Sequence, residues 1–184
     1  MKVYFISDDS FFLLGVEAVI ARKIDCPVEF VDVKKAMTYI NPSPDDILVV
    51  AIDNIDRRGE VMSFSFIKHC RVMLLINIKL NQTTRRTYPW IIKKGISPSE
   101  LALIIDKAKK SEKHFESVSR KCKQVVYSLC KGSHISEVSQ HFKLSSKHIY
   151  QMKRTLLIKF GISQCNSTNV LICRDILQGT SIHD

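Results

Sequence analysis

The pattern of apolar residues changes near residue 112, and this change constrains the fold more than any other feature. Before it, short apolar runs alternate with amphipathic stretches; after it, only helical spacing remains. Alternating strands and helices predict a parallel sheet with helices on both faces. We therefore expect an α/β unit with a five-stranded parallel sheet and flanking helices, followed by an all-α unit of four helices. The predicted strands are 3–6, 28–33, 47–52, 72–78 and 90–92. The helices expected between and after them are 11–23, 35–40, 60–69 and one beginning at Pro98.

A charged segment separates the two halves. Residues 106–117 read DKAKKSEKHFES and continue a helix that Ser97 is suited to cap. We therefore divide the chain into a sheet unit at 1–110, a linker at 111–117 and a helical unit at 118–184.

Three apolar stripes with the spacing of one helix face follow one another in the helical unit. Gly132 and Gly161 are suited to end the first and third helices. A link of three residues, 143–145, joins the second helix to the third, and Ser145 can cap the third. Two helices joined in this way predict a helix-turn-helix. The stripes are Cys122, Val125, Val126 and Leu129; Ile135, Val138, Ser139 and Phe142; and Ile149, Met152, Leu156 and Phe160.

The positive charge is concentrated in the second half. The formal net charge is +10; residues 1–105 hold 14 Lys/Arg and 12 Asp/Glu, and residues 106–184 hold 14 and 6. A basic unit attached to a nearly neutral one indicates a polyanionic partner. A membrane surface is the competing polyanion, but the cations are spread over several short helices, which favours nucleic acid.

Several other classes of protein are disfavoured. The longest apolar runs, VMLLINI and ILVVAI, are too short to cross a bilayer, and MKVYFISDDS does not resemble a signal peptide. We therefore expect a cytoplasmic protein without a membrane partner. The six cysteines include no CxxC pair, so we interpret them as small buried residues rather than a zinc site or redox switch. No nucleophile or metal spacing recurs, so we expect neither an enzyme nor a cofactor.

The face of the third helix opposite its apolar stripe carries residue types that can read DNA. Arg154 can bond guanine in bidentate fashion, and Gln151 can pair with adenine. The opposing interpretation is an ordinary solvated face. The base-facing candidates are Tyr150, Gln151 and Arg154. The candidates for phosphate or flanking contacts are Lys143, Ser145, Ser146, Lys147, Lys153 and Lys159.

The segment VSRKCKQVVYSLCKGSHISEVSQHFKLSSKHIYQMKRTLLIKFGI resembles the LuxR/GerE helix-turn-helix of NarL/FixJ-like regulators. The resemblance covers about 60 residues and implies a DNA-binding unit in which the same three residues face the bases. In this family a further helix often pairs two copies, and residues 166–177 occupy its place here. The apolar face of this helix could equally pack in the core of the same chain. The matches are Val125, Leu129, Gly132, Glu137, Val138, Leu144, Ser145, Lys147, Ile149, Lys159, Gly161 and Ile162. The departures are Lys121, Cys122, His148, Tyr150 and Met152.

The sheet unit resembles a response-regulator receiver domain, with parts missing. Asp8 and Asp9 match the acidic pair that would hold a divalent metal, and Asp53 is the candidate phosphoacceptor. Lys93 or Lys94 matches the expected lysine. The fourth strand ends in Ile76-Asn77 instead of Thr or Ser, so it lacks the hydroxyl that gates the switch. The resemblance therefore implies a degenerate receiver that serves in dimerisation or partner docking.

The function we predict is a sequence-specific DNA-binding transcription regulator that acts as a dimer on double-stranded DNA, independently of phosphorylation. The alternative is a partner-dependent regulator that forms a heterodimer through its receiver-like unit and binds DNA weakly alone. Sequence leaves homodimer and heterodimer open, together with the target genes, the input signal, and activation or repression.

Overall fold

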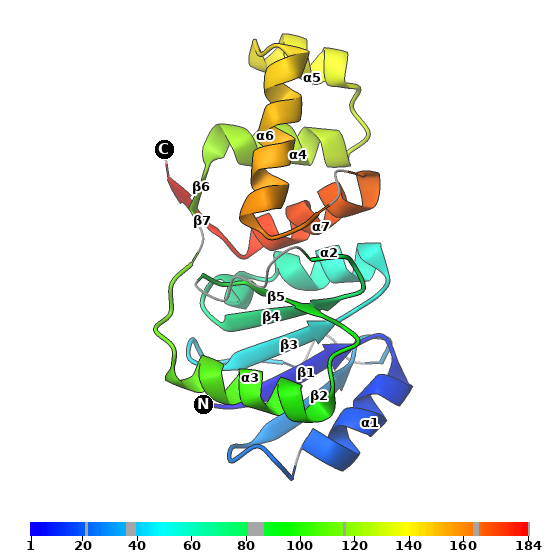
Figure 1. The fold of residues 1–184 in the computed structure, drawn as a ribbon, viewed down its shortest axis with the longest axis vertical. Helices are drawn as coiled ribbons and strands as arrows, with labels where there is room; N and C mark the ends of the chain where they lie inside the picture. Colours follow the sequence, from blue (N-terminus) through cyan, green and yellow to red (C-terminus); the bar gives the residue numbers. More distant parts are fainter. Residues whose placement is uncertain (21, 36–39, 81–86, 116, 164–165, 184) are drawn as a thin grey trace.

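Five parallel strands form the central sheet of the computed structural model, in the order β2-β1-β3-β4-β5 (Figure 1). The structure describes residues 1–20, 22–35, 40–80, 87–115, 117–163 and 166–183. Val3 of β1 aligns with Val28 of β2 and with Ile47 of β3. The predicted five-stranded parallel sheet is confirmed, with each strand within two residues of its expected bounds. The strands are β1 (Val3–Ser7), β2 (Val28–Asp32), β3 (Ile47–Ala51), β4 (Arg71–Ile76) and β5 (Trp90–Lys93).

One face of the sheet is covered by helices of the sheet unit alone. α1 (Ser10–Ile20) and α3 (Pro98–Lys110) pack there on alternate side chains of the central strands, such as Phe5, Val49 and Met73. Ser97 caps α3 as the sequence predicts, because its side chain accepts from the N–H of Glu100.

The opposite face is covered by helices from both halves of the chain. α2 (Ile55–Ser63) and a 3-10 turn, η1 (Ser65–Lys68), cover part of it, in place of the single helix expected at 60–69. The helix expected at 35–40 lies largely outside the described residues. In the described residues between β4 and β5, 77–80 and 87–89, no helix is present.

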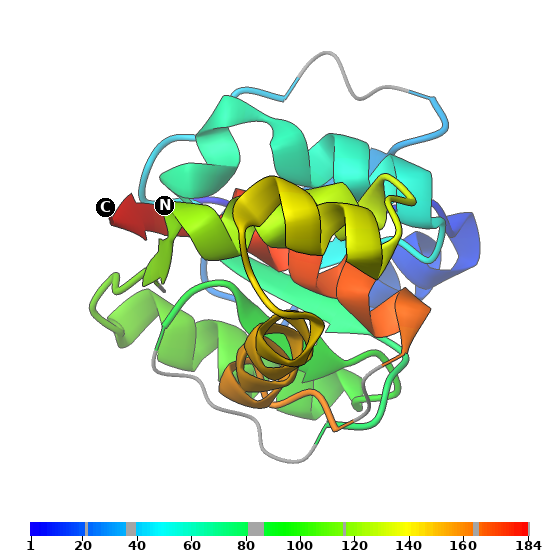
Figure 2. The same cartoon turned by 90° about the horizontal axis from the view of Figure 1, so that it is seen from above.

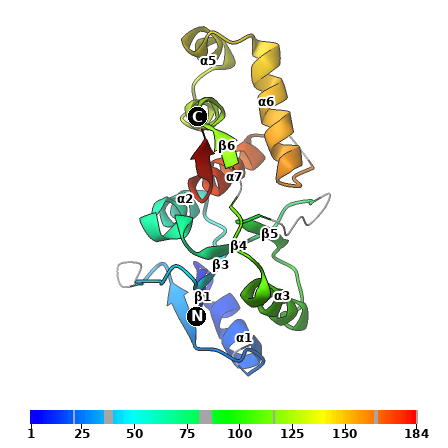
Figure 3. The same ribbon diagram turned by 90° about the vertical axis from the view of Figure 1, so that its left-hand side faces the viewer.

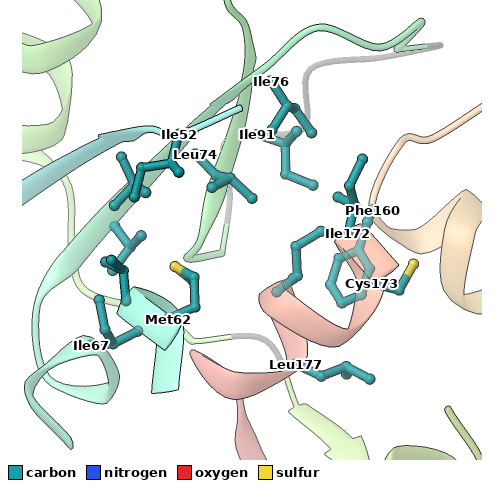
Figure 4. Packing of buried hydrophobic residues seen from close by; sticks show 14 of the residues in the cluster. Ile52, Met62, Ile67, Leu74, Ile76, Ile91, Phe160, Ile172, Cys173 and Leu177 are labelled. Atoms are coloured by element: carbon teal, nitrogen blue, oxygen red, sulfur yellow. The ribbon is translucent and has the colours of Figure 1, made fainter. Parts of the chain in front are cut away.

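α7 (Ser167–Gln178), from the helical unit, packs where the sheet would otherwise be open (Figure 4). Its Ile172, Cys173 and Leu177 lie in one cluster with Leu74 of β4 and Ile91 of β5. α7 also runs alongside α2 (Figure 2). The two units predicted from sequence therefore share a hydrophobic core.

A buried ion pair fastens α7 to α2. Arg58 Nε donates to Asp175 Oδ2 at 2.8 Å, and the two side chains are 5% and 0% exposed. Arg58 also donates to the carbonyl of Ile52, and Arg174 bonds both Asp175 and the carbonyl of Ile55. The carboxylate is thus held by two arginines, as a buried charge requires.

The described residues of the helical unit form four helices and, in contrast to the all-α expectation, two short strands. β6 (Ser117–Ser119) and β7 (Ser181–His183) form a parallel pair. Three residues are too few to show a strand pattern, and backbone pairing at the start and end of the unit holds them together. None of the described helices is long and apolar enough to span a membrane. The helices are α4 (Arg120–Cys130), α5 (Ile135–Phe142), α6 (Ser146–Lys159) and α7.

Candidate nucleic-acid interface

The turn between α5 and α6 is built by three residues with distinct tasks. Lys143 ends α5 in the left-handed conformation, with φ 50°. The Ser139 hydroxyl donates to the carbonyl of Leu144, and the Ser145 side chain accepts from the N–H of His148 to cap α6. Val125, Val138 and Ile149 form a small core beneath the turn, one from each of α4, α5 and α6. The start of α6 is therefore fixed by its own local contacts.

α6 lies along one side of the molecule (Figure 3), and one of its faces is exposed to solvent. Tyr150, Gln151 and Arg154, the base-facing candidates, are all exposed on it, and so are Lys147 and Ile158. Ile149, Leu156 and Phe160 of the predicted stripe are buried and Met152 is half-buried. The structure thus brings the three base-facing candidates onto one solvent-facing surface, which we call the α6 face together with Lys147 and Ile158.

α6 also buries Leu157, which the predicted stripe omits. The second half of α6 lies against the core shared with the sheet unit, so it is covered on more than one side. The chain after α6 is also fastened to the chain after β4: Ser163 N–H and Oγ donate to the carbonyl of Lys79, and Leu80 bridges Ile162. The orientation of the α6 face is therefore fixed relative to the sheet.

The cations around the α6 face differ in their engagement. Lys153 is half-buried, with Nζ 5.6 Å from the centre of the Tyr150 ring. Lys159 Nζ donates to the carbonyl of Ser117 at 3.0 Å. Within the described part of the chain, Lys147 and Arg154 form no ion pair or side-chain hydrogen bond.

Other candidates lie around the N-terminal end of α6. Lys143, Ser145 and Ser146 are exposed beside the first turn of α6, whose leading backbone N–H groups have no acceptor within the helix, apart from that of His148, which Ser145 caps. His148 and Thr155, which the sequence analysis did not select, are exposed on the flank of the α6 face. The Thr155 hydroxyl accepts from Gln151 Nε2 at 3.4 Å. Both residues lie one helical turn from Gln151, and this spacing could have placed them beside the α6 face from the sequence.

The acidic candidates of the sheet unit lie at the carboxyl edge of the sheet, where their carboxylates accept hydrogen bonds from backbone N–H groups or from Lys94. Both carboxylate oxygens of Asp8 accept backbone N–H groups, from Asp53 at 3.1 Å and Asn54 at 2.9 Å. Asp9 Oδ1 accepts from the N–H groups of the first turn of α1. Lys94 forms an ion pair with Asp53. Lys94, and not the exposed Lys93, is therefore the lysine at this edge.

This arrangement sets the charge of the edge. Burial acts to raise the pKa of Asp8, but the N–H groups of Asn54 and Asp53 and the nearby Lys94 hold that pKa below its usual range. Ile76, at the end of β4, is buried and offers no hydrogen bond from its side chain. Among the described residues, no group of three His, Cys, Asp or Glu side chains is arranged to hold a metal ion.

Comparison with known proteins gives solved structures but no family. No family model matches the chain, and no curated protein matches it. Similar solved structures include RcsB from Salmonella enterica serovar Typhimurium bound to promoter P1flhDC, with 16% identity over 96% of this chain and 98% of that one and a TM-score of 0.48. The same protein bound to promoter rprA gives 15% identity over 96% and 99%, with a TM-score of 0.47. The response regulator ChrA gives 13% identity over 94% of each chain, with a TM-score of 0.40. These values are too low to assign a function by likeness.

Proposed function

We propose that the chain is a sequence-specific DNA-binding transcription regulator that inserts α6 into the major groove. The observation that carries the proposal is the α6 face, where Gln151 and Arg154 are exposed together and Arg154 has no partner in the described part of the chain. A guanidinium without a partner on a rigid helix is suited to the bidentate acceptors of guanine. The side-chain amide of Gln151 offers the donor and acceptor that adenine requires.

The surroundings of α6 support contact with the phosphate backbone. Residues 106–184 hold 14 Lys/Arg against 6 Asp/Glu, so the unit that presents the helix is strongly basic. Lys143 and Lys147 are exposed near the N-terminal end of α6, where backbone N–H groups also favour an anion. These contacts position the helix, and Tyr150, Gln151 and Arg154 supply the readout. Two copies would bind successive major grooves.

Independence from phosphorylation is a part of the proposal supported by the carboxyl edge of the sheet. A phosphoryl group needs a positioned metal to neutralise its charge. Both Asp8 oxygens accept backbone N–H groups, so the acid that would hold the metal is already bonded, and the Lys94–Asp53 pair joins the ends of β5 and β3. The side chain of Ile76 cannot bond a phosphoryl oxygen. We therefore assign this edge a structural role that links β1, β3 and β5.

A second candidate function is a regulator that reads DNA only beside a different partner chain. It is favoured by His148, Tyr150 and Met152, which depart from the family pattern within α6 itself. The two candidates differ in whether the protein alone prefers particular DNA sequences.

The deciding experiment incubates the full-length protein with fragmented genomic DNA at near-physiological salt and sequences the fragments that it retains. Arg154→Ala is run in parallel, with Arg57→Ala as the matched control, because Arg57 is an exposed arginine on α2. We expect a shared motif with wild type and Arg57→Ala, and a motif degenerate at one position with Arg154→Ala. Uniform recovery, or none, from folded wild-type protein would contradict autonomous readout and favour the partner-dependent function.

A further inference from the structure

Two large apolar side chains of the helical unit are exposed among the residues that the structure describes, and both lie on the α6 face. Tyr150 has 54% of its surface exposed, and Ile158 has 62%. A single exposed apolar residue is ordinary, but these two stand among the polar and charged residues that we assign to DNA contact. The α6 face therefore offers a ligand apolar surface as well as hydrogen bonds and charge.

Of the two, Tyr150 lies nearer the part of a reading helix that reaches the bases. It is the fifth residue of α6, which begins at Ser146, whereas Ile158 lies eight residues later, about 12 Å along the helix axis. Helices that read the major groove contact base edges with residues near their N-terminal end. Arg154 follows Tyr150 by one helical turn, so the two side chains project from the same side of α6.

The ring of Tyr150 is restrained by a neighbouring cation. Lys153 Nζ lies 5.6 Å from the centre of the ring, within the range of a cation–π contact. Lys153 is itself half-buried, so its aliphatic chain is held by packing as well. More than half of the Tyr150 surface stays exposed beside this contact. A restrained side chain loses less conformational entropy on binding than a freely moving one, which suits Tyr150 to recognition.

The major groove offers one kind of apolar group to such a ring. Adenine, guanine and cytosine present only hydrogen-bond donors and acceptors at their edges, whereas thymine adds a methyl group at C5. An aromatic ring face placed against a donor or acceptor removes water from that group without replacing the hydrogen bond. Placed against the thymine methyl group, the same ring buries apolar surface on both partners.

We propose that Tyr150 reads the C5 methyl group of a thymine in the preferred DNA site. This inference rests on the proposed function, because it names the base feature that one residue of the α6 face recognises. Residues four positions apart are separated by about 6 Å along a helix axis, and base pairs are stacked about 3.4 Å apart. The thymine should therefore lie within about two base pairs of the guanine that we assign to Arg154.

The test replaces thymine by deoxyuridine, which removes the methyl group and keeps every donor and acceptor of the base. Each thymine near the position that becomes degenerate with Arg154→Ala is replaced in turn, and fluorescence anisotropy measures the affinity of the full-length protein. We expect one replacement to weaken wild-type binding about fourfold, as when one methyl group is withdrawn from an apolar contact. Tyr150→Phe should keep this ratio because its ring remains, and Tyr150→Ala should bind the two DNAs equally.

Phe11→Ala is the matched control, because Phe11 is an exposed aromatic residue on α1, at the end of the molecule far from α6 (Figure 1). Its ratio of affinities for the thymine and deoxyuridine sites should equal that of wild type. Thermal unfolding of each variant verifies its fold, and Tyr150 is exposed enough for its replacement to leave the core intact.

Three results would overturn this inference alone. The first is a preferred site in which no deoxyuridine near the Arg154 position weakens wild-type binding. The second is a deoxyuridine effect that Tyr150→Ala retains in full. The third is a Tyr150→Phe protein that loses the effect as Tyr150→Ala does, which would assign the contact to the hydroxyl group and not to the ring. The absence of any preferred site would contradict the proposed function itself, and this inference with it.

Discussion

Two arginines in different regions of the molecule are used in opposite ways. Arg58, at the contact between α2 and α7, is 5% exposed and bonded to Asp175 and to the carbonyl of Ile52. Arg154, on the α6 face, is exposed and has no partner in the described part of the chain. A buried guanidinium must be paired to offset its desolvation, whereas an exposed one is available to a ligand. Burial and pairing therefore separate the cation that holds the fold from the cation to which we assign base readout.

The carboxyl edge of the sheet resembles the α2–α7 contact, because its charged groups are also bonded within the chain. Its lysine is paired with Asp53, and its acids accept hydrogen bonds from the backbone. The residues that most resemble a phosphorylation site are thus already bonded within the chain. The α6 face differs because Lys147 and Arg154 have no ion-pair or hydrogen-bond partner among the residues that the structure describes.

The largest expected effect comes from breaking the buried ion pair between Arg58 and Asp175. Asp175→Ala leaves Arg58 buried without its carboxylate and should lower the free energy of unfolding by about 3–5 kcal/mol. Urea unfolding followed by circular dichroism measures this change. Asp56→Ala, at an exposed aspartate on α2, is the control and should cost much less. Similar losses in the two variants would show that the pair does not fasten α7 to the sheet unit.

The next largest effect is expected at the exposed Arg154 on the α6 face. Arg154→Ala should weaken binding to the preferred DNA by about 1–3 kcal/mol, because a bidentate contact with one base is lost. Its unfolding free energy should match that of wild type, since Arg154 supports no internal contact in the described residues. Titration of the preferred site and of a site changed at one base measures both affinities. Equal losses on all DNA would contradict a readout role and assign Arg154 to phosphate.

The sequence predicted the elements well, and it predicted their assembly only in part. The continuous apolar runs of β3 and β4 indicate strands covered on both faces, and both are fully buried. The apolar side of α7 is equally visible, but periodicity shows that a helix has a buried side without showing what covers it. Its ion pair joins residues 117 positions apart, and no local pattern reports such a pairing.

The candidate site shows the same division. Helical spacing was enough to select Tyr150, Gln151 and Arg154 as one exposed side, because the opposite side of α6 carries a regular stripe. Spacing alone could not show that Lys159 bonds the carbonyl of Ser117 or that Lys153 lies beside the Tyr150 ring. Those contacts depend on β6 and on side-chain conformation. The sequence therefore predicts which residues face outward, and the structure shows which of them are already engaged.

A smaller effect on DNA binding is expected at Lys147, the second exposed cation of the α6 face. Lys147→Ala should weaken binding to all DNA sequences alike and reduce the slope of log affinity against log salt concentration by about 1. The reason is that, in the proposed complex, a lysine near the start of α6 would contact phosphate and release a counterion on binding. Lys68→Ala, at an exposed lysine of η1, should leave the slope unchanged. A loss confined to the preferred sequence would instead indicate base contact by Lys147.

The smallest expected effect is the contribution of the Asp8 carboxylate to stability, which its pH dependence tests. The pKa of Asp8 is held below its usual range, so ionised Asp8 stabilises the fold fully above the unfolded-state pKa of about 3.9, and this contribution is lost as pH falls through the lower folded-state pKa. Asp8→Asn should therefore lower the free energy of unfolding by about 1 kcal/mol near pH 7. Urea unfolding from pH 7 to pH 3 should show this difference shrinking below about pH 4. The exposed Asp25→Asn should show no such convergence. A difference that persists unchanged at pH 3 would mean that the shape of the side chain, and not its charge, supports the two N–H groups at the end of β3.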